Sequence, residues 1–95
     1  MSNTDVIIHD KKDNVGVVVI EKINRGQKCE CWIMEDDSST QIQSISEIPL
    51  GHKIAMVDFS EGDTIIKYGH DIGKVVQSIK KGEHVHVHNV KTKKW

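Results

Sequence analysis

The most constraining feature of this sequence is a series of short, β-branched apolar runs that turn residues separate at close intervals. None of the runs continues with the i, i+3, i+4, i+7 spacing of an amphipathic helix. Valine and isoleucine favour strands, and Gly, Asn and Asp favour the turns between them. The pattern therefore predicts an all-β chain, with strands at residues 6–8, 15–20, 29–34, 53–57, 64–68, 74–79 and 85–90.

One turn pattern occurs three times along the chain. An apolar residue is followed by two polar residues, a glycine and two further residues that lead into the next strand, and the glycines are Gly26, Gly62 and Gly82. Glycine adopts positive φ without steric cost, so each is expected at a tight turn between strands. The polar stretch at 38–41 is instead predicted to be an exposed loop.

The length of 95 residues leaves room for one domain, predicted to span residues 1–95. A domain of this size, with only four aromatic residues, cannot enclose a large active site, so catalysis would be shared with another chain. The predicted core consists of Val17, Val19, Ile23, Ile33, Ile54, Met56, Phe59, Ile65, Val75, Ile79, Val85 and Val87. Because this core is modest, self-association into a homo-oligomer or docking to a large subunit would help to stabilise the domain.

Charge and cysteine content narrow the class of protein. The formal net charge of −1 predicts no general attraction to nucleic acid or membranes, although residues 49–95 carry eight Lys/Arg against five Asp/Glu. Cys29 and Cys31 are too few for a disulfide framework and are expected to be buried free thiols. The sequence shows neither a signal peptide nor an apolar run of ~18 residues, so a cytoplasmic location is expected.

Three histidines alternate in the segment His84-Val85-His86-Val87-His88, which Asn89 follows. In a continuous strand all three imidazoles would share one face, and the two valines would point into the core. Neighbouring histidines of such a strand lie ~6.5–7 Å apart and can converge on one ion, whereas the first and last lie ~13 Å apart and cannot. The residues alone leave two interpretations open, a chelating pair or the polar face of an exposed strand.

Four segments carry a resemblance to a known family. They are residues 13–17, 48–55, 66–69 with 72–73, and 82–89. In this order they resemble the N-terminal domain of altronate and galactarate dehydratases, a family that includes the small subunit of sulfolactate sulfo-lyases. The resemblance covers nearly the whole chain and implies an SAF-type β-clip fold.

The resemblance implies a small subunit or N-terminal domain of a metal-dependent carbon–oxygen lyase, a dehydratase that acts on sugar acids such as altronate. This chain would be inactive without the large catalytic subunit or domain. Two alternatives stay open: the small subunit of a sulfolactate sulfo-lyase, which is a carbon–sulfur lyase, and a non-catalytic SAF module that binds carbohydrate or protein. Three imidazoles in one segment favour the enzymes, because a binding module does not need them.

The resemblance also implies particular site residues. His52, His86 and His88 are the expected catalytic residues, and Lys53 is expected to contact the carboxylate of an anionic hydroxy-acid substrate. His86 and His88, preferred over His84, are the expected ligands of a divalent metal, iron(II), shared with the large subunit or domain. His52 is expected to approach these two rings from the turn before it, because three nitrogens from two segments can enclose an ion.

Overall fold

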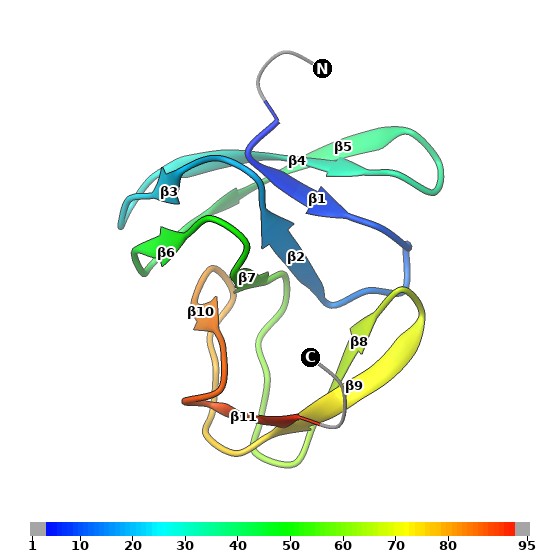
Figure 1. Cartoon of the computed structure of the whole chain (residues 1–95), viewed down its shortest axis with the longest axis vertical. Helices are drawn as coiled ribbons and strands as arrows, with labels where there is room; N and C mark the ends of the chain where they lie inside the picture. Colours follow the sequence, from blue (N-terminus) through cyan, green and yellow to red (C-terminus); the bar gives the residue numbers. More distant parts are fainter. Residues whose placement is uncertain (1–3, 93–95) are drawn as a thin grey trace.

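The computed structural model describes residues 4–92 and confirms the all-β prediction. No helix occurs among these residues, and hence none that is long and apolar enough to cross a membrane. A six-stranded sheet, a three-stranded sheet and a two-stranded ribbon make up the molecule (Figure 1). The strands are β1 (Val6–Ile8), β2 (Val15–Val18), β3 (Lys22–Ile23), β4 (Lys28–Ile33), β5 (Ser38–Gln43), β6 (Ile48–Pro49), β7 (Lys53–Ala55), β8 (Thr64–Lys67), β9 (His70–Val75), β10 (His84–Val85) and β11 (Val90–Thr92).

Strand β7 contributes side chains to both buried cores of the molecule. The large sheet has the order β10-β7-β2-β1-β4-β5, and the small sheet has the order β11-β9-β8. Side chains alternate faces along β7, so Ile54 packs into one buried cluster and Ala55 into another. The first core contains Val6, Ile8, Val18, Ile23, Cys29, Cys31, Ile42, Ile48 and Ile54. The second core contains Val15, Ala55, Phe59, Ile65, Val75, Ile79, Val85 and Val90.

The three predicted glycine turns are confirmed. Gly26, Gly62 and Gly82 have φ values of 84°, 94° and 90° and lie between strands. Gly82 has a second reason to be glycine, because a Cβ at this position would lie 2.3 Å from the Gln43 carbonyl oxygen. Its turn therefore packs directly against the end of β5. The cysteine prediction is also confirmed, since Cys29 and Cys31 are buried and free.

Several predicted elements are wrong in their extent. Residues 38–41 are not a loop, because they belong to β5, which pairs with all of β4 despite its polar composition. The strand predicted at 74–79 runs instead from His70 to Val75, since the two-residue turn at Tyr68 and Gly69 pairs it at once with β8, and residues 76–79 lie outside it. The strand predicted at 85–90 does not exist as one element: β10 ends at Val85, a turn follows, and β11 begins at Val90.

These differences change the core. Val87 lies in the turn and is 62% exposed, and Val19 lies beyond the end of β2 and is 39% exposed. Val17 is half-buried, lies opposite Lys53 in the ladder and belongs to neither buried core. Ile33 and Met56 are half-buried and pack against the edge of the first core. The other predicted core residues, Ile23, Ile54, Phe59, Ile65, Val75, Ile79 and Val85, are buried as predicted.

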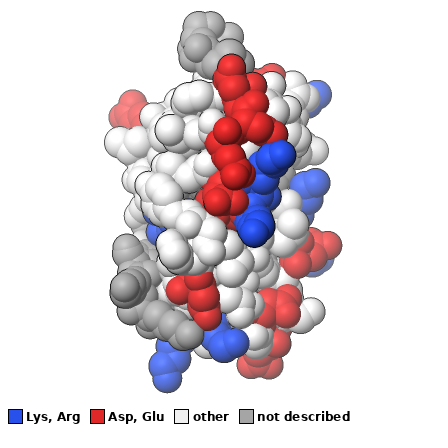
Figure 2. Space-filling view, turned by 90° about the vertical axis from the view of Figure 1, so that its right-hand side faces the viewer, with Lys and Arg blue, Asp and Glu red and all other residues white. Residues whose placement is uncertain are grey.

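Surface charge is mixed on the face that carries the β4–β5 and β8–β9 turns. Figure 2 shows this face, where Asp and Glu side chains form a stripe with Lys or Arg side chains beside it. Lys11 and Asp36 make an exposed ion pair of 3.5 Å between the loop after β1 and the turn after β4. This face therefore presents no extended basic patch of the kind that binds nucleic acid.

Candidate functional site

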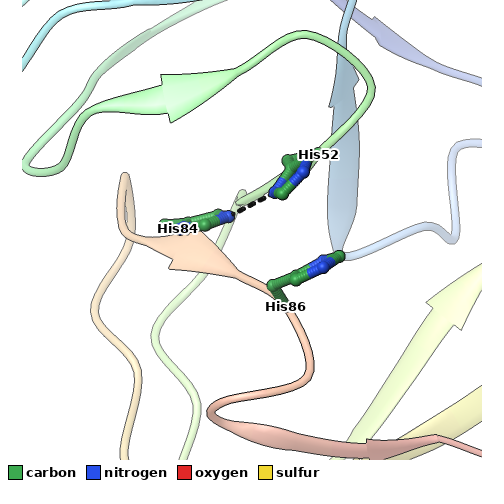
Figure 3. Close-up of side chains that lie close together, drawn as sticks. All are labelled: His52, His84 and His86. Atoms are coloured by element: carbon green, nitrogen blue, oxygen red, sulfur yellow. Dashed lines mark hydrogen bonds between the residues drawn. The ribbon is translucent and has the colours of Figure 1, made fainter.

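Two chain segments bring three histidines together (Figure 3). His52 ends a tight turn in which its N–H donates to the Pro49 carbonyl, with Gly51 at φ 83°. His84 lies in β10, and His86 lies in the bend directly after it. Because β10 pairs antiparallel with β7, the segment that carries His84 and His86 runs beside the start of β7, where His52 lies.

The rings are in direct contact. His52 Nδ1 lies 2.8 Å from His84 Nε2, and the His52 and His86 rings stack with centroids 4.1 Å apart. One ligating nitrogen from each of the three histidines lies within 4.8 Å of the other two. The predicted approach of His52 to His86 is therefore confirmed. We call His52, His84 and His86 the histidine cluster.

His88 is placed differently from the prediction. The expectation that His86 and His88 share a strand face is wrong, because the chain turns after His86 instead of continuing as a strand. The His88 ring contacts His84, with centroids 5.1 Å apart, but does not belong to the group of nitrogens that could share an ion. His84, which the sequence interpretation ranked lower, takes that position.

The turn after His86 is held by a residue that sequence reasoning did not single out. Asn89 is buried, and its side-chain Oδ1 accepts a hydrogen bond of 3.0 Å from the His86 N–H. Its Nδ2 donates a bond of 2.8 Å to the His84 carbonyl. The signal was present in the sequence, since asparagine is a common turn residue whose side chain bonds nearby backbone. The alternating histidines and valines favoured a strand, so the turn preference of Asn89 was not used.

Burial gives the cluster its electrostatic character. Burial and the neighbouring histidines lower the pKa of His84 from its ordinary 6.5 to about 4. Burial, the other rings and Lys53 also lower the pKa of His86. Near neutral pH these imidazoles are therefore uncharged, with nitrogen lone pairs available to a metal or a proton.

Lys53 is a buried cation next to the cluster. Only 4% of this residue is exposed, and it lies in β7 between β2 and β10, opposite Val17 and Val85. Burial and the charge of Lys67 lower the pKa of Lys53 to about 8. At neutral pH the ammonium form still predominates, so the site combines neutral imidazoles with one positive charge.

The donor set fits a divalent transition metal. Imidazole nitrogen suits iron, zinc, copper and nickel ions, and three such ligands leave room for a substrate or water. Ligand nitrogens around one ion lie ~3.0–3.4 Å apart when each bond is ~2.1 Å, so small ring rotations would close the cluster on an ion. Among the residues that the structure describes, this is the single group of three or more His, Cys, Asp or Glu side chains with such proximity.

A second histidine contact lies elsewhere. The His9 and Tyr68 rings are in tilted contact with centroids 4.0 Å apart, and His9 Nε2 lies 3.0 Å from the Tyr68 hydroxyl oxygen. Asp13 fixes the Tyr68 turn, because its carboxylate accepts bonds from the N–H groups of Tyr68 and Gly69 at 3.0 and 2.9 Å. Among the described residues, His9 does not belong to any group of three potential metal ligands.

Comparison with known proteins gives a consistent set of relatives. The family model of the altronate/galactarate dehydratase SAF domain matches residues 4–93. The (2R)-sulfolactate sulfo-lyase subunit alpha of Chromohalobacter salexigens is 54% identical over 91 residues, which cover 96% of this chain and 97% of that protein. The protein of the same name from Paracoccus pantotrophus is 46% identical over 65 residues, 68% of this chain and 97% of that protein. Altronate dehydratase of Bacillus subtilis is 39% identical over 82 residues, 86% of this chain but 15% of that protein.

Proposed function

Since this chain belongs to the altronate/galactarate dehydratase SAF domain family, we propose that it is the small subunit of a lyase that acts on an anionic hydroxy acid. The relatives are lyases, and two of them are alpha subunits of sulfolactate sulfo-lyases. The identity of 54% across 97% of one such subunit favours sulfolactate as the substrate. The observation that carries the proposal is the histidine cluster beside the buried Lys53.

The proposed reaction is an elimination. The C2–H bond next to the carboxylate breaks, its electron pair forms the C2=C3 double bond, and the C3–S bond breaks with its electrons leaving on sulfite. The resulting enol takes a proton at C3, loses the proton of its C2 hydroxyl and becomes a 2-keto acid. Such a reaction needs a cation for the carboxylate, a base for the carbon proton and an environment that stabilises the enolate charge.

The residues of this chain divide these tasks. Lys53 binds the substrate carboxylate through its buried ammonium group, because an ion pair is stronger where water is excluded. His52, His84 and His86 hold a divalent metal, for which iron(II) is the expected ion, and a bound ion of this kind supplies Lewis-acid stabilisation of negative charge. His88 lies beside the cluster rather than within it. We assign it proton transfer, through its ring nitrogen.

A dehydratase is the second candidate. The Bacillus subtilis altronate dehydratase matches 86% of this chain, and a sugar acid offers the same C2–H bond and carboxylate with hydroxide as the leaving group. The acid–base groups and the cation serve either leaving group equally. The two candidates therefore differ in product and not in the arrangement of this domain.

The test is to assemble this chain with its large-subunit partner and to supply sulfolactate or altronate with iron(II). Release of sulfite with a 2-keto acid is expected from sulfolactate, and neither chain alone is expected to turn over. Turnover of altronate without sulfite release would establish the dehydratase instead. Failure of both substrates, or full activity of this chain alone, would contradict the proposed small-subunit role.

A further inference from the structure

We propose that Asn89 is the positioning residue of the histidine cluster, setting the relative orientation of the His84 and His86 rings. The inference rests on the proposed function in one respect only: the proposed function supplies the metal-binding role of the cluster. Its evidence is the pair of side-chain hydrogen bonds that join Asn89 to the backbone on either side of Val85, at His86 N–H and His84 C=O.

The structure contains an internal comparison, because the same turn device occurs five times within residues 4–92. In each case the N–H of the fourth residue donates to the carbonyl of the first, and the fourth side chain accepts from the N–H of the first. The fourth residues are Asp13, Gln27, Asp63, Glu83 and Asn89. The device therefore works with an amide or a carboxylate at this position.

Only two of these fourth residues are buried, and each makes bonds beyond its own turn. The Asp13 carboxylate also accepts from two N–H groups, those of Tyr68 and Gly69, which suits a group that only accepts. Asn89 instead donates to a carbonyl, that of His84. A carboxylate there would place an acceptor against an acceptor. The extra bond thus requires an amide at 89 and a carboxylate at 13.

This extra bond acts on the cluster and not on the turn. The backbone bond from Asn89 N–H to the His86 carbonyl, at 3.1 Å, and the bond from Val76 N–H to the Asn89 carbonyl, at 2.9 Å, already hold the turn. The Nδ2 bond reaches back into β10 and fixes His84 relative to His86. Since side-chain direction follows backbone orientation, one planar amide sets the direction of both imidazoles.

The experiment uses the full chain and separates the two bonds of Asn89. Asn89→Asp retains an acceptor for His86 N–H, as Asp63 does in its own turn at 2.7 Å, but removes the donor to His84. Asn89→Ala removes both bonds without adding charge. Asp63→Asn and Asp13→Asn are the matched controls, the first at an exposed fourth residue and the second at the other buried fourth residue.

Two measurements are made on each variant. Titration with Co²⁺ measures affinity for a metal, and imidazole ¹⁵N spectra report the His52–His84 ring contact without any metal. Both Asn89 variants are expected to lose about 10- to 100-fold in Co²⁺ affinity, as is usual when a group that orients ligands is removed. They are also expected to lose the ring contact while their backbone amide spectra stay folded. Both controls are expected to keep Co²⁺ affinity within about twofold of the original protein, because substitutions at distant sites rarely affect one another by more than this.

The outcomes separate this inference from the proposed function. Unchanged Co²⁺ affinity and ring spectra in folded Asn89 variants would overturn the positioning role, and so would loss of the whole fold in both variants. If the original protein binds no Co²⁺, the proposed metal site fails. The ring spectra then still decide whether Asn89 orients the histidines.

Discussion

Two turns of this molecule that each end in a buried polar residue use one hydrogen-bonding device for different ends. At residues 10–13 the carboxylate of Asp13 ties the chain to the β8–β9 turn, whose exposed end carries Tyr68 in ring contact with His9. At residues 86–89 the amide of Asn89 ties the chain to β10 and supports the histidine cluster. The comparison teaches that the device itself is structural, and that the chemistry depends on what the buried side chain connects.

The largest expected effect separates the two regions by activity. His84→Ala in the assembled enzyme is expected to reduce turnover by about 100-fold or more, because loss of a metal ligand should cost more than the ~10- to 100-fold that loss of a ligand-orienting group costs. Its melting temperature should change little, because a half-buried imidazole adds little to the core. His9→Ala is the matched control from the other turn and is expected to keep turnover near that of the original enzyme. Equal losses of turnover in both variants would remove the distinction between the regions.

The next effect separates the regions by stability. Asp13→Ala leaves the N–H groups of Tyr68 and Gly69 without the acceptor that they have at 3.0 and 2.9 Å. We expect it to lower the free energy of unfolding by about 2–3 kcal/mol, since two hydrogen bonds to a buried, charged carboxylate are lost. This corresponds to a fall of ~10–20 °C in melting temperature for a domain of this size. Thermal unfolding measures the loss, and unchanged Co²⁺ affinity of the folded variant would show that the damage stays local.

The sequence could predict the strands and glycine turns of the fold better than the contacts of either of these two turns. The glycine turns and most core positions follow from local preferences, because positive φ favours glycine and apolar side chains alternate along strands. The presence of His52, His86 and Lys53 in one area was also predicted. The exchange of His88 for His84 was not, because alternation from His84 to Asn89 favours a strand. The bond from Asn89 into β10 overrides that preference, and this contact exists only once the chain is folded.

A smaller effect tests whether the buried charge of Lys53, which the proposed function needs, lowers the stability of the cluster region. Lys53 lies on an interior strand of the large sheet with 4% of its surface exposed, and burial lowers its pKa to about 8. Replacing a buried charge by a well-packed apolar group often stabilises a protein. We expect Lys53→Met to raise stability by about 1 kcal/mol, or ~4–8 °C in melting temperature, while the assembled enzyme loses substrate affinity.

The control for this change is Lys67→Met, because Lys67 is only half-buried and lies over the Tyr68 ring at 5.3 Å. This variant is expected to show no gain in melting temperature. Measurement of unfolding at pH 7 and of KM in the assembled enzyme tests both statements. A fall in the melting temperature of Lys53→Met would show that the ammonium group stabilises the sheet, contrary to the expectation.

The smallest expected effect is a loss of stability at acid pH in the metal-free chain, which should affect one of the two turns before the other. The pKa of His84 is lowered to about 4 in the folded protein, below the ~6.5 of an unfolded histidine. Between these values the unfolded state binds more protons, so stability from this group is complete above pH ~6.5 and is lost as the pH falls toward 4. Melting temperature should therefore fall between pH 6.5 and 5, and His84→Gln should flatten that fall. Amide exchange should also increase first at residues 86–89 and later at residues 10–13, since protonation of His84 acts on the turn whose amide supports it. Simultaneous opening of both turns, or an unchanged slope in His84→Gln, would place the acid-sensitive group elsewhere in the chain.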